Sequence, residues 1–235
     1  MPSENEKWGS HPFKEIDNFL DLDDFNSCVD FLEGLQQKSR ANKIISTRKA
    51  GMKNSNRDYD QDFLTKLEQK YTEKCKNILA ELEPSKTHLQ VTLNCSPSIT
   101  PAGVCYPIHN DSLVKVLSGI VYLAPKKSLG TFIHSNQNDK NPSQIQWKQN
   151  KAFFFSRFFN KTWHSYCASE SADRYTLVIN LVTENKRLHL VEEIGIVLAS
   201  LSLTYDYLKL IPYKIKVKSK RLISRVYDVI RIREQ

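Results

Sequence analysis

Three short segments of the chain carry side chains that can bind a metal ion and a carboxylate. His109 and Asp111 lie two residues apart, and His164 and Arg174 follow in later segments. Residues two apart in an extended segment point the same way, so His109 and Asp111 can reach one ion. A second histidine from a neighbouring strand completes three ligands. Two imidazoles and one carboxylate suit non-haem Fe(II) that activates O₂, so this spacing predicts iron-dependent oxidation.

Arg174 lies ten residues after His164, in a segment with strong strand propensity that runs to Val182. Alternation along a strand puts Arg174 and Thr176 on one face. An arginine that projects into a pocket beside a metal is a carboxylate receptor, because its planar fork pairs with both oxygens. Thr176 can add a hydroxyl, and Tyr122 on another strand a phenol. We therefore expect these three residues to bind a carboxylate cosubstrate.

This constellation resembles the Fe(II)- and 2-oxoglutarate-dependent dioxygenases, most closely their prolyl-hydroxylase-like branch. The resemblance covers about residues 88–183 and depends on a His-x-Asp pair, a distant histidine and an arginine ten residues later. The supporting context is Tyr106 before the pair, the strand Gly119-Ile-Val-Tyr122-Leu, Gly130-Thr131 after it, and a Phe-rich strand before Trp163-His164-Ser165.

The resemblance implies a double-stranded β-helix that holds iron through His109, Asp111 and His164. It also implies that Arg174, helped by Tyr122 and Thr176, pairs with the distal carboxylate of 2-oxoglutarate. Fe(II), 2-oxoglutarate as cosubstrate and O₂ are the expected cofactors, with succinate and CO₂ as products and hydroxylation as the default outcome. Asp111 argues against a halogenase, which needs that coordination position empty. The loop after Gly130 departs from the family pattern, so no substrate is inferred from it.

Four further residues are expected in the pocket or in a layer behind the ligands: Tyr106, Trp163, Asn180 and His134. For His134 an ordinary place at the edge of a loop is the competing interpretation. The run of phenylalanines at 153–155 can form an aromatic binding box. Alternate packing into the core and into the barrel is the interpretation we favour for it.

The elements that must position these residues follow an α+β pattern. Apolar spacing of three and four predicts a helix after Asp21 or Asp23 and a long helix over 60–82, which Pro84 ends. Residues 40–59 are expected to form a loop. After Pro84 the period changes to two, and short strands of the jelly-roll kind are predicted. The strands are expected over 88–93, 116–123, 131–134, 144–147, 152–155 and 175–182, with turns at 94–97, 125–127 and 136–143.

Composition places the chain among globular proteins. Hydrophobic residues make up 40% and charged residues 26%, and no apolar run reaches transmembrane length. The N-terminus has no apolar core of a signal peptide, so we expect a cytoplasmic enzyme, with attachment to a membrane surface as a further option. Five scattered cysteines without a C-x-x-C pair predict reduced thiols, neither a disulfide framework nor a zinc site.

The C-terminal region has a composition of its own. Apolar residues from Val191 to Leu208 step by three and four, which is typical of a helix packed on the core, a homodimer seam, or a partner or membrane surface. Residues 212–235 hold eight basic and two acidic side chains and so carry most of the net charge of +8. Such a segment can bind an anionic surface or remain a solvated face. A nucleic-acid partner is not favoured.

The sequence thus predicts a dioxygenase domain over 1–185, with its jelly-roll core at about 86–183 and helices before it, and a basic helical extension over 186–235. The expected partner is an unidentified substrate: a small molecule, a sugar or a peptide side chain. Two other functions stay open. One is a catalytically silent jelly-roll module with a binding tail, which the complete triad disfavours. The other is a cupin-like metalloenzyme without 2-oxoglutarate, which Arg174 disfavours.

Overall fold

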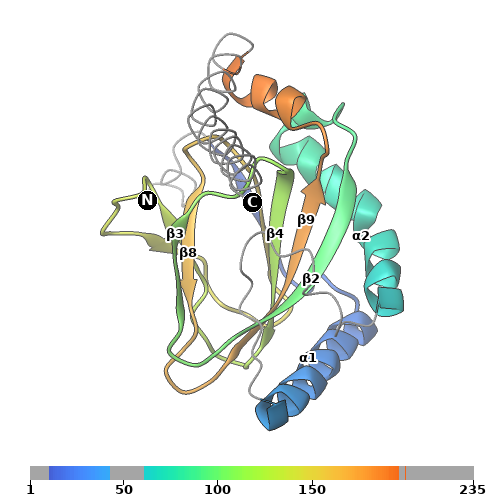
Figure 1. Ribbon diagram of the computed structural model, residues 1–235, viewed down its shortest axis with the longest axis vertical. Helices are drawn as coiled ribbons and strands as arrows, with labels where there is room; N and C mark the ends of the chain where they lie inside the picture. Colours follow the sequence, from blue (N-terminus) through green and yellow to red (C-terminus); the bar gives the residue numbers. More distant parts are fainter. Residues whose placement is uncertain (1–10, 43–60, 196–198, 200–235) are drawn as a thin grey trace, which may run out of the picture. The chain divides into compact units, whose positions relative to one another are not determined.

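The computed structural model describes residues 11–42, 61–195 and 199 of the 235-residue chain. The chain divides into two units, Met1–His189 and Leu190–Gln235, and every helix and strand below belongs to the first (Figure 1). Residues 186–195 are helical. The predicted basic segment 212–235 and most of the apolar stripe that starts at Val191 lie outside the described residues. No helix of the described part has both the length and the hydropathy that a membrane span needs.

Two helices precede most of the strands, as the sequence predicts. Helix α1 (Leu22–Asn42) begins with Asp23 and Asp24 in its first turn, where carboxylates stabilise the positive end of the helix dipole. Helix α2 (Gln61–Leu82) ends before Pro84, and its buried face has the predicted spacing. Its buried residues are Leu64, Leu67, Tyr71, Cys75, Ile78, Leu79 and Leu82.

The larger sheet has five antiparallel strands in the order β1-β7-β4-β9-β2. Their bounds are Phe13–Ile16 for β1, Ala152–Ser156 for β7, Lys115–Ala124 for β4, Arg174–Val182 for β9 and Thr92–Thr100 for β2. Both helices lie on the outer face of this sheet (Figure 1). Their apolar stripes are thereby removed from water, which is the main favourable contribution to folding.

The smaller sheet has four antiparallel strands in the order β3-β8-β5-β6. Its strands are β3 (Cys105–His109), β8 (Trp163–Cys167), β5 (Thr131–His134) and β6 (Ser143–Gln144). Strands β3 and β8 lie on the side of the larger sheet that is opposite to the helices (Figure 1). The mixture of helices with antiparallel sheets confirms the α+β prediction.

The larger sheet separates two hydrophobic cores. Leu177, Ile179 and Leu181 of β9 pack with the helices, whereas Tyr122 of β4 and Phe153 of β7 pack with Ile133 of β5 between the sheets. Phe154 faces the helix-side core, and its neighbours Phe153 and Phe155 face the interior. Alternate packing of the phenylalanine run is therefore confirmed. The side chains of β9 that share the inner face are Arg174, Thr176, Val178, Asn180 and Val182.

Two strand predictions are wrong in their bounds. The strand expected over 88–93 runs instead from Thr92 to Thr100 and passes through the predicted turn and Pro97. Proline lacks a backbone N–H. It is tolerated in β2 because this strand lies at the edge of its sheet and pairs with a neighbouring strand of that sheet on one side only. The strand expected over 144–147 ends at Gln144, and Trp147 leaves the ladder.

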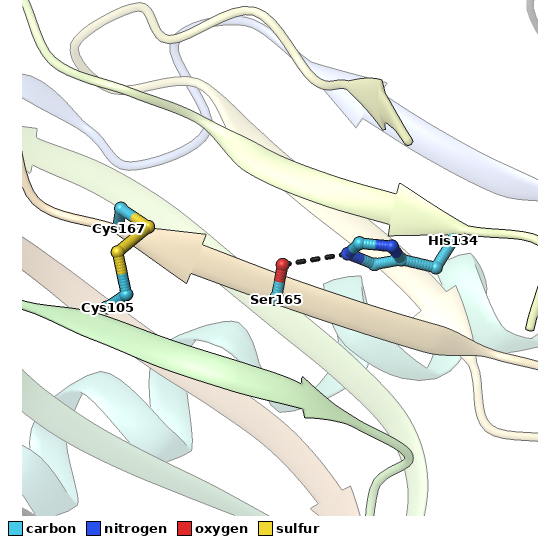
Figure 2. Close-up of a disulfide and its surroundings, with 4 residues drawn as sticks. All are labelled: Cys105, His134, Ser165 and Cys167. Atoms are coloured by element: carbon cyan, nitrogen blue, oxygen red, sulfur yellow. Dashed lines mark hydrogen bonds between the residues drawn. A yellow bond between two sulfur atoms is a disulfide. The ribbon is translucent and has the colours of Figure 1, made fainter. Parts of the chain in front are cut away.

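The prediction that all cysteines are reduced is also wrong. Cys105 and Cys167 form a disulfide whose Cα atoms lie 4.0 Å apart (Figure 2). The two residues are partners across the β3–β8 ladder, 62 residues apart in sequence. Their pairing is a consequence of strand register, which the scattered spacing of the cysteines does not show. Cys28, Cys75 and Cys95 are free and buried.

Candidate active site

The two histidines of the predicted triad meet across one strand pair. His109 of β3 is the ladder partner of His164 of β8, and their ring centroids lie 4.1 Å apart. Asp111 follows β3, and its Oδ2 lies 4.0 Å from His164 Nε2. One ligand atom of each residue lies within 4.8 Å of the others. The structure thus brings together the three side chains that the sequence singles out as metal ligands.

Backbone carbonyl groups fix the orientation of both imidazole rings. His109 Nδ1 lies 3.0 Å from the carbonyl oxygen of Pro107, and His164 Nδ1 lies 3.1 Å from that of Thr162. A carbonyl only accepts hydrogen bonds, so each Nδ1 carries the proton and each Nε2 keeps its lone pair. Both rings therefore present the tautomer that binds a metal through Nε2.

The protonation states of the triad favour a cation. Burial lowers the pKa of His109, and it lowers the pKa of His164 to about 4, so both rings are neutral near pH 7. Burial alone would raise the pKa of Asp111, but the charge of Lys115 and the hydrogen bond from Ser118 outweigh it and hold that pKa well below its usual range. Two neutral imidazoles and one carboxylate are the protonation states that metal binding requires.

Two residues that the sequence did not single out hold the Asp111 carboxylate. Lys115 Nζ donates to Asp111 Oδ1 at 2.5 Å, and Ser118 Oγ donates to Oδ2 at 2.5 Å. Ser118 lies on the inner face of β4 with Ile120 and Tyr122, so its alternation with Tyr122 was a usable signal. Lys115 gives no comparable signal, because its position depends on the irregular pairing at the start of β4.

The loop between β7 and β8 holds the backbone beside the ligands. Arg157 Nε donates to the carbonyl oxygen of Asp111 at 2.9 Å, and Asn110 Nδ2 donates to that of Phe158 at 2.8 Å. Thr162 Oγ1 donates to Asn110 Oδ1 at 3.0 Å, two residues before His164. These bonds connect the segments of Asp111 and His164 independently of the strand ladder.

Arg174 is enclosed by aromatic rings, and it forms no ion pair with an acidic residue of the part of the chain that the structure describes. The residue is 2% exposed, and its guanidinium carbon lies 4.6 Å from the centroid of Tyr166, 5.5 Å from that of Trp147 and 5.6 Å from that of Tyr122. Nε and Nη2 are buried and make no hydrogen bond. Burial lowers the pKa of Arg174, and the tyrosines oppose this. A buried cation with unpaired donors needs an anionic partner, since desolvation of such a group is costly.

Tyr122 and Thr176 flank Arg174 as the sequence predicts. They are ladder partners across β4 and β9, and both are buried. The Tyr122 hydroxyl donates to Thr131 Oγ1 at 3.0 Å and accepts from the Thr131 N–H. Burial raises the pKa of Tyr122, so its phenol keeps the proton.

The aromatic wall around the Arg174 guanidinium consists of the rings of Tyr122, Trp147 and Tyr166. Trp147 and Tyr166 were not predicted to lie there. Trp147 stacks on Tyr122 at 4.6 Å, and its Nε1 donates to the carbonyl oxygen of Pro125. Gly130 makes room for this loop, since a Cβ at Gly130 would lie 1.7 Å from the carbonyl oxygen of Ile145. This close approach joins segments that are distant in sequence, and local periodicity does not show it. The sequence therefore predicted a strand at Trp147.

Of the remaining four predicted residues, three belong to the smaller sheet and lie on its two sides, and Asn180 belongs to the larger sheet. Tyr106 packs edge-on against His109 at 4.6 Å and stacks on Tyr166. His134 lies on the opposite face of β5 from Ile133, and its Nε2 is 2.8 Å from Ser165 Oγ (Figure 2). Trp163, its ladder partner, donates to the carbonyl oxygen of Asn160. The structure therefore does not bring His134 and Trp163 to the triad.

Asn180 lies on the inner face of β9, directly opposite Ser118. The triad fits a divalent metal ion, and the surroundings of Arg174 fit a carboxylate. The triad offers two imidazole nitrogens and a carboxylate to a divalent ion. The unpaired guanidinium at the other end of the same interior fits a carboxylate.

Solved structures with this fold include a prolyl hydroxylase. A prolyl hydroxylase from Trichoplax adhaerens in complex with a peptide of hypoxia inducible factor matches with a TM-score of 0.53 at 17% identity, over 76% of this chain and 87% of that one. AviO1 from Streptomyces viridochromogenes matches with a TM-score of 0.52 at 12% identity, over 76% and 93%. A prolyl-4-hydroxylase from Pseudomonas putida follows with a TM-score of 0.48 at 13% identity, over 74% and 94%.

The first two matches show that the chain shares the fold of these proteins. No protein-family model matches the sequence, and no curated protein matches it.

Proposed function

We propose that this chain is an Fe(II)- and 2-oxoglutarate-dependent dioxygenase that hydroxylates a substrate and releases succinate and CO₂. Its sheets would then form a double-stranded β-helix, with a catalytic domain over 1–185 and an extension over 186–235. Fe(II) with 2-oxoglutarate and O₂ supplies the oxidising chemistry that no protein side chain provides. The residues of the chain bind, orient and shield the reacting groups.

His109, Asp111 and His164 are the proposed metal ligands. Their Nδ1 bonds to carbonyl groups keep both Nε2 atoms available, and Ser118 and Lys115 keep the carboxylate ionised and oriented. An iron ion held by these three residues would keep further coordination positions for the cosubstrate and O₂.

Arg174 is the proposed receptor of the distal carboxylate of 2-oxoglutarate, with the Tyr122 and Thr176 hydroxyls beside it. The rings of Tyr122, Trp147 and Tyr166 keep water away from this end, and an ion pair in such surroundings is stronger than one in water. The single observation that carries the proposal is the pair of unpartnered, buried donor nitrogens on Arg174 in the interior that also holds the triad.

The substrate is proposed as a small molecule, a sugar or a peptide side chain. The Trichoplax adhaerens hydroxylase was solved with a peptide, which supports the last of these. We further propose a cytoplasmic location, with a homodimer through 191–208 and an anionic surface at 212–235 as options. The Cys105–Cys167 disulfide counts against the cytoplasm, because a reducing compartment keeps most such thiol pairs open.

The proposal is tested by succinate release with Fe(II) and 2-oxoglutarate, compared between wild type and Asp111→Ala. We expect turnover in the wild type only, with Co(II) affinity lowered at least tenfold in the variant, because one of three ligands is lost. Ser112→Ala, one residue along the chain, is the matched control and should behave as wild type. A wild-type protein that binds neither Co(II) nor 2-oxoglutarate would instead favour a catalytically silent module.

A further inference from the structure

One buried polar group of the interior has no role in the site described so far. Asn180 is 1% exposed, and its Oδ1 is buried without a hydrogen-bond partner. Its neighbours Ile179 and Leu181 face the helix-side core, so Asn180 points between the sheets. A buried acceptor without a partner destabilises the protein, and native structures contain few of them. The position of Asn180 therefore calls for a ligand that donates to it.

Asn180 lies at the end of the interior that Arg174 does not reach. The two residues are six positions apart on β9, which corresponds to about 20 Å along the strand. Ser118, the ladder partner of Asn180, donates to the Asp111 carboxylate. The metal ligand is thus anchored at the level of Asn180, whereas the carboxylate receptor lies at the opposite end. Ionised 2-oxoglutarate has only acceptor oxygens, so it cannot donate to Asn180 Oδ1 even where it reaches the metal, and the donor must come from a second ligand.

The side chains around Asn180 are polar. Asn94 of β2 is its partner on the other side, and Ser96 is the next residue of β2 on the same face. Leu93 and Cys95, which alternate with them along β2, face the helix-side core. Ser118, Asn180 and Asn94 are thus three polar side chains at one level of the larger sheet, and Ile120 and Val178, one level nearer to Arg174, are apolar.

We infer that Asn180 binds the substrate, and that the substrate carries an N–H or O–H donor close to the carbon that reacts. This inference rests on the proposed function and narrows its substrate class. Peptides and sugars present such donors, whereas the hydrocarbon chain of a fatty acid leaves Oδ1 unpaired. A site built around a hydrogen bond discriminates strongly against an analogue that cannot make it, because its own polar group is then left buried and unsatisfied.

The first experiment separates binding from structure with Asn180→Leu, which replaces the amide by an apolar group of similar size. Removal of an unsatisfied buried acceptor should raise the melting temperature of the metal-free protein by roughly 2–4 °C. The affinity for 2-oxoglutarate with Co(II) bound should stay within about twofold of wild type, since Arg174 is untouched. A melting temperature lowered by that amount would show that Asn180 holds the fold together, and would overturn the inference.

The second experiment names the substrate class with three probe sets: capped tripeptides of the form acetyl-Gly-Xaa-Gly-amide, monosaccharides, and straight-chain fatty acids. Succinate release above the substrate-free rate is measured for each probe. We expect stimulation by peptides or by sugars. Stimulation by fatty acids alone, or by none of the probes, would overturn the inference.

The third experiment compares wild type and Asn180→Leu, each with the best probe and with the same probe methylated at its hydrogen-bond donor. In wild type, methylation of the donor on that probe should lower kcat/KM about tenfold or more, and Asn180→Leu should lower kcat/KM for the unmodified probe to the same level. In Asn180→Leu the two probes should react equally. Val178→Ala, on the same face, is the matched control and should keep the wild-type preference. Equal rates for both probes in wild type would contradict the assignment.

Different results overturn the assignment of Asn180 and the proposed function. If wild type binds 2-oxoglutarate and releases succinate but Asn180→Leu behaves as wild type with every probe, only the assignment of Asn180 falls. If wild type binds no 2-oxoglutarate with Co(II), the proposed function fails and this inference falls with it.

Discussion

At the scale of single residues, Arg174 is held in a position that lowers the stability of the free protein. Arg174 is 2% exposed, and its Nε and Nη2 have no hydrogen-bond partner among the described residues, so its guanidinium loses hydration without a replacement. The surrounding rings of Tyr122, Trp147 and Tyr166 offset part of this loss through cation–π contacts. The proposed carboxylate of 2-oxoglutarate would supply the missing partner.

This explanation predicts opposite effects of Arg174→Met on stability and on binding. The free protein should gain about 1–3 kcal/mol in free energy of unfolding, because an unpaired buried cation is replaced by an apolar chain. The affinity for 2-oxoglutarate should fall by about 2–5 kcal/mol. Arg174→Lys should restore only part of it, since lysine lacks the planar fork. Denaturant unfolding and calorimetric titration measure the two quantities, and unchanged 2-oxoglutarate affinity in Arg174→Met would refute the receptor role.

His164 gives the metal-free protein a defined pH dependence. Its folded-state pKa is about 4, below the value of 6.5 of an unperturbed histidine, so the unfolded chain binds more protons between these values. Stability is therefore fully present above about pH 6.5 and falls as the pH drops toward 4, by roughly 3 kcal/mol in total. Denaturant midpoints across this range test it, with His164→Gln as the variant whose slope should be flatter. Equal slopes in both proteins would mean that His164 titrates normally.

At the scale of the elements, the β3–β8 pair carries both imidazole ligands and the disulfide. Cys105 and Cys167, Tyr106 and Tyr166, and His109 and His164 are successive partners on these two strands, with a bulge before the histidines. The disulfide therefore fixes the register of the strands whose alignment brings the two ligands together.

Opening this disulfide should weaken metal binding as well as the fold. We expect the double substitution Cys105→Ala with Cys167→Ala to lower the free energy of unfolding by about 2–4 kcal/mol and to lower Co(II) affinity. Treatment of wild type with a dithiol reductant should have the same effect, reversed on reoxidation. Cys75→Ala, in the helix-side core, is the control: it should lose stability but keep Co(II) affinity. If the double variant binds Co(II) as wild type does, the disulfide stabilises the fold only.

The sequence predicted those elements whose signal is local. Helix α2 and strands β4, β5, β7 and β9 have strong periodicity, and the alternation along β9 already put Arg174, Thr176 and Asn180 on one face. The disulfide, Trp147 and Lys115 were missed because each depends on register or on a close approach between distant segments. For His134 the sequence left a pocket position and the edge of a loop both open; it ends β5 and lies on the opposite face from Ile133, because neighbouring residues of a strand face opposite sides.

At the scale of the whole molecule, the triad and the residues around Arg174 that the structure describes belong to Met1–His189. His189 Nδ1 lies 2.8 Å from the carbonyl oxygen of Leu113, two residues after Asp111. Removal of residues 190–235 should therefore leave Co(II) and 2-oxoglutarate affinities unchanged, while any adhesion to anionic lipid vesicles is lost.

Sedimentation with such vesicles at low and high salt measures the second effect. Replacement of Lys214, Lys216, Lys218 and Lys220 by Gln should remove the salt-sensitive part of the adhesion without loss of folding. A full-length chain that ignores anionic vesicles at low salt would exclude the surface role of 212–235. A truncated chain that no longer binds Co(II) would instead show that the extension supports the site.

The central claim is that one interior binds Fe(II) through the triad and 2-oxoglutarate through Arg174 and the metal together. An anaerobic titration of 2-oxoglutarate into the Fe(II)-loaded protein tests it most directly, because chelation of the iron produces a visible charge-transfer band. We predict a band that saturates at about one 2-oxoglutarate per chain, needs higher concentrations in Arg174→Met, and is absent in Asp111→Ala. A wild-type protein that takes up Fe(II) but shows no band at saturating 2-oxoglutarate would contradict the account.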